Sequence, residues 1–230
     1  MGIPSYFSYI VKNHANIIKK FNSNAIIVDN LYLDCNSIIY DVVRNIDFAK
    51  IVESDVDTII RALCSKIDEY IQELKPRNTI YIAFDGVAPV AKLEQQRSRR
   101  YKSLYQNNIS RSIYKSVEPD PWNTTAITPG TLFMKRLNEQ LYINYKNPLK
   151  YNVLNIIVSC SDHPGEGEHK LFQHIRDYSY EHKNVTTVIY GLDADLIMLS
   201  INHLPISNNI YLFRETPHFI QSINSELEPN

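Results

Sequence analysis

The chain is poor in cysteine, glycine and proline, and each shortage excludes a class of protein. Its three cysteines, Cys35, Cys64 and Cys160, are widely spaced and form no C-x-x-C pair. Neither a disulfide framework nor a structural zinc site is therefore expected, and a reducing compartment is favoured. Six glycines and 11 prolines in 230 residues exclude a fibrous or low-complexity chain. No apolar run approaches the roughly 18–20 residues that a membrane span needs.

Targeting signals are also missing from the first residues. Residues 1–6 contain no basic region followed by an apolar stretch, so no secretory signal is expected. Tyr6 stands where the N-myristoylation pattern that begins at Gly2 requires Ser or Thr. We therefore expect an intracellular protein, in the cytoplasm rather than in the nucleus.

The chain also lacks an excess of positive or negative charge. Lys and Arg number 24 and Asp and Glu number 25, which gives a formal net charge of −1. That balance excludes a histone-like polycation. A length of 230 residues with 44% hydrophobic content suits one or two globular domains. No repeat and no linker composition divides the chain, so we expect a single domain over residues 1–230.

Apolar, β-branched stretches alternate with helical patterns along the chain. A helix is predicted where apolar residues recur at spacings of three and four from Val56 to Leu74. Such alternation predicts an α/β domain with a mainly parallel central sheet flanked by helices. The first four of the expected strands are dense enough in Ile and Val to be buried on both faces. The five strands are expected at Ala25–Cys35, Thr79–Phe84, Val153–Ser159, Val185–Tyr190 and Asn209–Phe213.

Two segments between these elements carry more specific expectations. Residues 106–125 are polar and contain Pro119 and Pro121, so they predict a long, flexible connection. Thr128 and Pro129 predict the start of a helix, because Thr caps helices and Pro suits their first position.

Carboxylates follow four successive predicted strands. In open parallel sheets, functional groups gather beyond the carboxyl ends of the strands. Any one of these acids could instead cap a helix or occupy a helix's first turn. Together, like charges on one edge would repel one another unless a cation lay among them. The six residues are Asp34, Asp85, Glu166, Glu168, Asp193 and Asp195.

Oxygen ligands without a nearby Cys or His cluster suit Mg²⁺ or Mn²⁺. Two such ions about 3.5–4 Å apart, bridging a scissile phosphate, would use this many carboxylates. Metal-dependent phosphodiester hydrolysis is therefore the expected chemistry. His163 and His169 flank the Glu pair and are expected at the surface or behind the ligands.

A basic segment follows Asp85 directly. From Lys92 to Lys115 the chain has seven basic residues and one acid, Glu94. Four side chains fall within roughly 100° on one helix face and could together cage a terminal phosphate. An exposed charged helix would be the ordinary interpretation of such a run. Its position beside a predicted metal ligand favours the phosphate site. We call these four residues the basic face: Lys92, Gln96, Arg99 and Arg100.

Several segments resemble the N-terminal conserved region of the XRN family of 5′→3′ exoribonucleases. They occur in family order and span nearly the whole chain. They comprise residues 1–4, Asn30–Ser37, Asp85–Pro89, Ala91–Lys92, Gln95–Arg97, Arg99–Arg100, Ile127–Thr131, Pro164–Lys170 and Tyr190–Met198.

The resemblance implies a fold like that of PIN and flap nucleases. It also implies Mg²⁺-dependent, processive removal of nucleotides from single-stranded RNA with a 5′ monophosphate. The six carboxylates match the family's metal-binding acids, and the basic face matches its 5′-phosphate pocket.

The chain departs from the family pattern at three points. Tyr40 stands where the family has a His that stacks on the 5′ base, and an aromatic ring preserves stacking. Val90 replaces a frequent Arg. The family's further metal-binding Asp and second conserved region are not found in these 230 residues, so a protein partner could replace that region. No motif supports a substitute for that Asp among Glu215, Glu226 and Glu228.

Two alternative functions remain open at this point. One is a non-catalytic module that binds 5′-phosphorylated RNA, and the other is a flap-type, structure-specific endonuclease. The complete acid set disfavours the first alternative. The basic face disfavours the second, because an endonuclease need not hold a free 5′ monophosphate.

Overall fold

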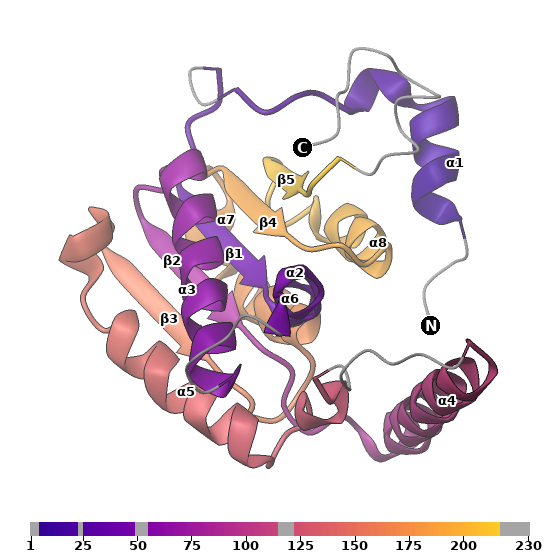
Figure 1. Ribbon diagram of the computed structural model, residues 1–230. Coiled ribbons are helices and arrows are strands. Elements are labelled where there is room, and N and C mark those ends of the chain that lie inside the picture. Colours follow the sequence, from indigo (N-terminus) through magenta and orange to yellow (C-terminus); the bar gives the residue numbers. More distant parts are fainter. Residues whose placement is uncertain (1–4, 23–24, 49–54, 115–121, 217–230) are drawn as a thin grey trace.

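Five parallel strands form the centre of the computed structural model, which describes residues 5–22, 25–48, 55–114 and 122–216 (Figure 1). The order of the strands across the sheet is β3-β2-β1-β4-β5, so the first strand in the sequence lies in the middle. The predicted α/β class is confirmed. The strands are β1 (Asn30–Asp34), β2 (Thr79–Ala83), β3 (Asn155–Ser159), β4 (Thr187–Tyr190) and β5 (Ile210–Phe213).

Helices cover both faces of this sheet (Figure 1). The α-helices are α1 (Tyr6–Asn13), α2 (Asn36–Asn45), α3 (Asp55–Leu74), α4 (Val90–Tyr114), α5 (Leu132–Asn144), α6 (Gly167–Asp177), α7 (Ser179–His182) and α8 (Asp195–His203). Short 3₁₀ turns are η1 (Ala15–Ile17), η3 (Thr124–Ala126) and η4 (Pro148–Tyr151). None of the helices in the described ranges is both long and apolar enough to cross a membrane.

The alternation of side chains along β1 assigns the two faces. Leu31 and Leu33 belong to the larger core, with apolar residues of α2, α3 and α5. Tyr32 points the other way and packs with Phe172 of α6 and Leu196 of α8. Because successive residues of a strand face opposite sides, one run of apolar residues supplies both layers.

Strand register places the functional edge of the sheet. Asp34, the last residue of β1, pairs with Ala83, the last residue of β2, and Ala83 pairs with Ser159, the last of β3. Leu33 pairs with Tyr190, at the end of β4. The residues that follow these four strands therefore emerge side by side.

Three local expectations need correction. β3 is an edge strand and is only partly buried along most of its length, because just one neighbouring strand covers it. The connection expected over 106–125 is helical as far as Tyr114, since Pro119 is the first helix-breaking residue after Gly86 and Pro89. Residues 115–121 lie outside the described ranges.

The start of α5 also differs from the prediction. Gly130 has a φ of 89°, which a right-handed helix cannot contain, so the helix begins after it. The cap is Thr131, whose Oγ1 accepts a hydrogen bond from Met134 N at 3.3 Å. Thr128, the expected cap, instead donates its hydroxyl hydrogen to Thr125 O.

Candidate active site

The fold brings the six predicted carboxylates to one edge of the sheet. Each follows the end of a strand or begins the helix after it. We call them the acidic edge: Asp34 at the end of β1, Asp85 after β2, Glu166 and Glu168 at the start of α6, and Asp193 and Asp195 at the start of α8.

Three of these side chains form a tight group. Carboxylate oxygens of Glu168, Asp193 and Asp195 all lie within 4.8 Å of one another. Burial, and next the charge of Asp193, raise the pKa of Glu168 to about 7. The repulsion that the sequence predicted is therefore present in the fold.

Asp34 lies deepest in the acidic edge. Burial raises its pKa well above the ordinary range, and the charges of Asp85, Glu168 and Asp193 raise it further. Its Oδ1 is buried and has no hydrogen-bond partner in the described part of the chain. A buried carboxylate oxygen without a donor is costly, so this atom points to a cation as its missing partner.

The acidic edge therefore fits a hard divalent cation. Its donors are carboxylate oxygens from four successive strand ends, which is the ligand type that Mg²⁺ and Mn²⁺ favour. Glu168, Asp193 and Asp195 are close enough to share one ion, and Asp34 and Asp85 stand beside them. A set of carboxylate ligands is compatible with both Mg²⁺ and Mn²⁺.

Asp193 also serves the local fold. Its Oδ1 accepts a hydrogen bond from Asp195 N at 3.1 Å, which supports the first turn of α8. Glu168 lies in the first turn of α6, where the helix dipole favours an acid. Asp193 and Glu168 thus also support the first turns of their helices, which was the alternative role that the sequence suggested. These roles coexist with the cluster and do not explain the burial of Asp34.

Glu166 connects the acidic edge to the basic face. Lys92 Nζ donates to Glu166 Oε2 at 2.6 Å, and this hydrogen bond is the largest cause of the raised pKa of Lys92. His169 Nε2 lies 3.5 Å from the same oxygen and 3.8 Å from Glu168 Oε1. The His169 side chain is 54% exposed, and its ring nitrogen forms with Glu166 and Glu168 a second group of atoms that could hold a metal ion, so the outer role expected for His169 stays a prediction.

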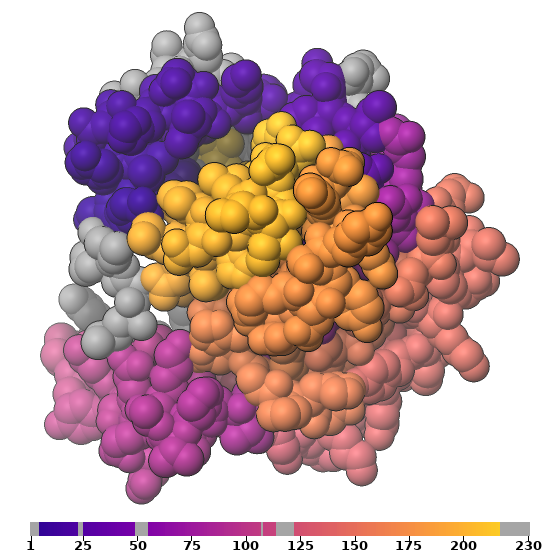
Figure 2. All heavy atoms as spheres, turned by 180° about the vertical axis from the view of Figure 1, so that it is seen from behind, coloured from indigo at the N-terminus to yellow at the C-terminus, as the bar shows by residue number. Residues whose placement is uncertain are grey.

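The basic face lies on α4, which projects away from the sheet in Figure 1. The magenta residues that include α4 form a lobe at one corner of the space-filling view (Figure 2). Arg99 is exposed, whereas Gln96 and Arg100 are partly covered. Val90, at the start of α4, is 83% exposed and adds no polar group.

Tyr40, predicted to stack on a base, lies beside the basic face. Burial raises the pKa of its hydroxyl, while the charges of Arg100 and Arg99 lower it and that of Asp85 raises it. The ring is 39% exposed and therefore accessible to a ligand. The structure thus gathers Tyr40, the basic face and the acidic edge into one region.

Two residues of this region were missed from the sequence. Lys170 Nζ donates to Phe84 O at 2.7 Å and to Cys160 O at 2.8 Å, so it ties α6 to the ends of β2 and β3. Asn36 binds Asp85 through its side chain. Both residues stand within the segments that carry the family resemblance, which was the available signal.

Other candidates lie elsewhere or outside the described residues. Glu215 accepts hydrogen bonds from the hydroxyls of Tyr70 and Tyr190, so its carboxylate is already engaged by side chains of the fold. Residues 1–4, Glu226 and Glu228 lie outside the described ranges.

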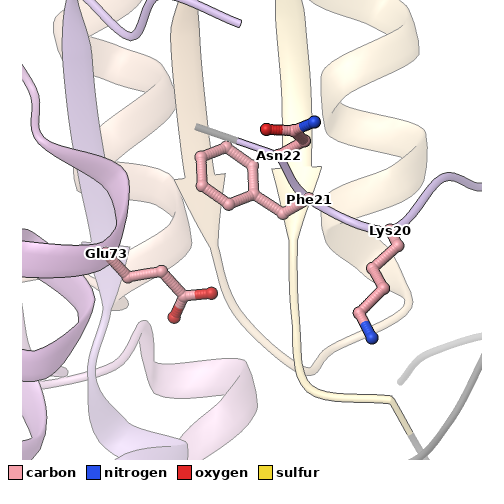
Figure 3. Close-up of a pocket in the computed structure, with 4 residues that line it drawn as sticks. All are labelled: Lys20, Phe21, Asn22 and Glu73. Carbon is pink, nitrogen blue, oxygen red and sulfur yellow. The ribbon is translucent and has the colours of Figure 1, made fainter. Parts of the chain in front are cut away.

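The surface also has a hollow that none of the predicted site residues lines. It has a volume of about 470 Å³ and is lined by Lys20, Phe21, Asn22 and Glu73 (Figure 3). None of these four side chains belongs to the acidic edge or to the basic face. The hollow therefore has no part in the candidate site.

Comparison with known proteins connects this geometry to a family. The family model described as the XRN 5′-3′ exonuclease N-terminus matches residues 1–216. The chain is 37% identical over 217 residues to 5′-3′ exoribonuclease 1 of Saccharomyces cerevisiae, covering 88% of this chain and 14% of that protein.

Two further relatives give the same result. The Schizosaccharomyces pombe 5′-3′ exoribonuclease 1 is 34% identical over 213 residues, which cover 87% of this chain and 16% of that protein. The Homo sapiens 5′-3′ exoribonuclease 1 is 36% identical over 216 residues, which cover 87% of this chain and 12% of that protein. The chain thus spans less than a fifth of the length of these curated relatives.

Proposed function

The chain belongs to the XRN 5′-3′ exonuclease family, and from this membership we propose that it forms the nuclease domain of a 5′→3′ exoribonuclease in RNA degradation. The proposal includes Mg²⁺ or Mn²⁺ as cofactor, in two sites, and single-stranded RNA with a 5′ monophosphate as substrate. The relatives are much longer, so a partner chain or a further region that completes the site is part of the proposal.

One observation carries the proposal. Six carboxylates converge around Asp34 Oδ1, which has no hydrogen-bond partner in the described part of the chain. This acidic edge lies next to the basic face of α4, and the contact between Lys92 and Glu166 joins the two. A site for a terminal phosphate beside a site for metal ions suits cleavage close to an RNA end.

The chain's own residues then have separate tasks. The six carboxylates would hold the cations, with Glu168, Asp193 and Asp195 nearest to one another. When bound, hard divalent cations activate water and stabilise the charge that develops on a phosphate during hydrolysis. Gly167 N and Asn36 keep the Asp85 carboxylate in place.

The basic face would hold the end of the substrate. Guanidinium groups of Arg99 and Arg100 bind phosphate oxygens in a fixed geometry, and the Gln96 amide adds a neutral donor. Tyr40, close to both arginines, would stack on the first base. A terminal monophosphate is thereby distinguished from a 5′ hydroxyl by the charge it brings.

Substitutions at two exposed residues should distinguish metal binding from phosphate binding. Asp193→Ala should lower the cleavage rate of 5′-monophosphate RNA by about 100-fold or more, while RNA binding stays near the wild-type level. Arg99→Ala should instead raise KM about 10-fold with little change in kcat, because it removes one charged contact to the phosphate. Wild-type cleavage by Asp193→Ala would overturn the proposal.

A further inference from the structure

Asn36 contacts the carboxylates at the ends of both central strands. Its Nδ2 donates a hydrogen bond to Asp85 Oδ2, and its Oδ1 accepts one from Asp85 N at 3.1 Å. Its own backbone N–H donates to the Asp34 carboxylate, which partly offsets the raised pKa of Asp34. Asn36 is the first residue of α2, so its side chain links the start of the helix after β1 to the residue that follows Phe84 after β2.

Asp85 is held from its other side as well. Gly167 N, in the first turn of α6, donates to Asp85 Oδ1 at 2.7 Å. Both carboxylate oxygens therefore have a protein donor, and rotation about the bond that carries the carboxylate, which is otherwise soft, is restricted. The orientation of Asp85 is fixed before any ligand binds.

We propose that Asn36 is a positioning residue that sets the Asp85 carboxylate for metal binding. The inference rests on the proposed function, since it concerns the same acidic edge. Only a short side chain with one donor and one acceptor can bind the carboxylate and the backbone N–H of Asp85 together. Asn36 also adds no negative charge beside Asp34 and Asp85, where the pKa of both carboxyl groups is already raised.

Asn36→Asp and Asn36→Ala remove different parts of this contact. The Asp variant has nearly the same shape and can still accept from Asp85 N, but it replaces the donor by a carboxylate facing Asp85. The Ala variant removes both hydrogen bonds. Residues that orient metal ligands usually change metal affinity or activity by about 10- to 100-fold when they are replaced.

Asn30 offers a matched control at the opposite end of β1. Its Nδ2 donates to Thr187 Oγ1 at 3.2 Å, and the residue is 6% exposed. Asn30→Ala thus removes a buried amide hydrogen bond from the same strand without touching the acidic edge. It should lower thermal stability and leave metal affinity unchanged.

The experiment measures Mn²⁺ affinity of the 230-residue chain by titration calorimetry without RNA, and then kcat and KM on 5′-monophosphate RNA at saturating Mg²⁺. Both Asn36 variants should bind Mn²⁺ about 10- to 100-fold more weakly than wild type, with KM for RNA within about twofold. Circular dichroism checks that each variant is folded. If Asn36→Ala is unfolded, the isosteric Asn36→Asp carries the comparison.

The outcomes separate this inference from the proposed function. Unchanged Mn²⁺ affinity in a folded Asn36 variant overturns the inference, even if the wild-type chain cleaves RNA. A wild-type chain that cleaves no RNA, but binds Mn²⁺ more tightly than the Asn36 variants, overturns the function and leaves the inference standing. Failure of the wild-type chain to bind Mn²⁺ overturns both.

Discussion

Lys92 Nζ lies 2.6 Å from Glu166 Oε2, and this ion pair is the direct contact between α4 and the acidic edge. The Glu166 side chain is only 12% exposed, whereas that of Lys92 is 35% exposed. The pair therefore lies at the boundary between the mostly half-buried acidic edge and the open face of α4. A phosphate bound at Lys92 would adjoin the acids that are proposed to hold the metal.

Lys92→Met should weaken recognition of the RNA end. The methionine keeps most of the apolar stem but loses the ammonium, so KM for 5′-monophosphate RNA should rise about 10-fold. Discrimination against 5′-hydroxyl RNA should fall with it. Lys102→Met is the control, because Lys102 is an exposed lysine of the same helix that lies ten residues, about 15 Å, further along the helix axis than Lys92. Equal effects of the two variants in steady-state kinetics would contradict the assignment.

Asp34→Asn should largely abolish the effect of metal removal on stability. In EDTA the buried Asp34 carboxylate faces other acids, so the neutral amide should raise the free energy of unfolding by about 1–3 kcal/mol. Added Mg²⁺ should stabilise the wild type and hardly change the variant. Urea denaturation with and without Mg²⁺ measures both values.

The control for that experiment is Asp162→Asn, an exposed acid after β3 and outside the acidic edge. It should respond to Mg²⁺ as the wild type does. A variant Asp34→Asn that is less stable than wild type in EDTA would contradict this prediction, because it would show that the fold favours the carboxylate over the amide even without a metal ion.

Gly167→Ala should disturb the acidic edge directly. A Cβ there would lie 2.5 Å from Asp34 Oδ1, so α6 or Asp34 must shift, at a cost of about 1–3 kcal/mol in stability. Gly130→Ala is the comparison, because Gly130 has open space around it and only a positive φ of 89°. That strain costs about 1–2 kcal/mol. Both variants should melt earlier, but only Gly167→Ala should weaken Mn²⁺ binding.

His174 should make stability depend on pH. Burial, followed by the charge of His182, lowers the pKa of His174 below its ordinary 6.5, so the unfolded chain takes up this proton first as pH falls. The contribution of neutral His174 to the free energy of unfolding is therefore complete above about pH 6.5. It is lost as the pH falls from there towards the lower pKa of the folded state.

The surroundings of His174 guide the choice of variant. The nearby charges of Glu181 and Asp177 oppose the lowering of its pKa. Its ring contacts Tyr32, Tyr81, Tyr178 and His182.

Phenylalanine keeps an aromatic ring among these contacts but does not titrate. In urea denaturation between pH 7.5 and 5.5, His174→Phe should lose less stability than wild type. The variant of the exposed His14, His14→Gln, should follow the wild-type curve. Parallel curves for His174→Phe and wild type would refute this prediction.

The sequence was sufficient to place the acidic edge, for a physical reason. Asp34 and Asp85 come directly after apolar strands, and parallel strands must end at a common edge, so chain order alone brings the acids together. Helical spacing likewise placed Lys92 and Arg99 on one helix, which α4 confirms. Their catalytic and binding roles remain predictions.

What the sequence could not show depends on contacts between distant side chains. The pairing of Asn36 with Asp85 joins the start of α2 to the loop after β2 and has no local sequence pattern. Lys170 likewise points its ammonium at two backbone carbonyls, of Phe84 and Cys160. The polar composition of residues 106–114, the last part of α4, suggested a connection, because a helix that buries little has no apolar face to reveal it.

We propose that this chain degrades RNA from a 5′-monophosphate end with a metal ion bound at the acidic edge. The most direct measurement follows identical RNAs with a 5′ monophosphate, triphosphate or hydroxyl, each in Mg²⁺ and in EDTA. We expect release of mononucleotides from the monophosphate RNA alone, and only in Mg²⁺. Binding of that RNA without turnover would indicate a non-catalytic module, and internal cuts independent of the 5′ end would indicate an endonuclease. Either result would contradict the claim.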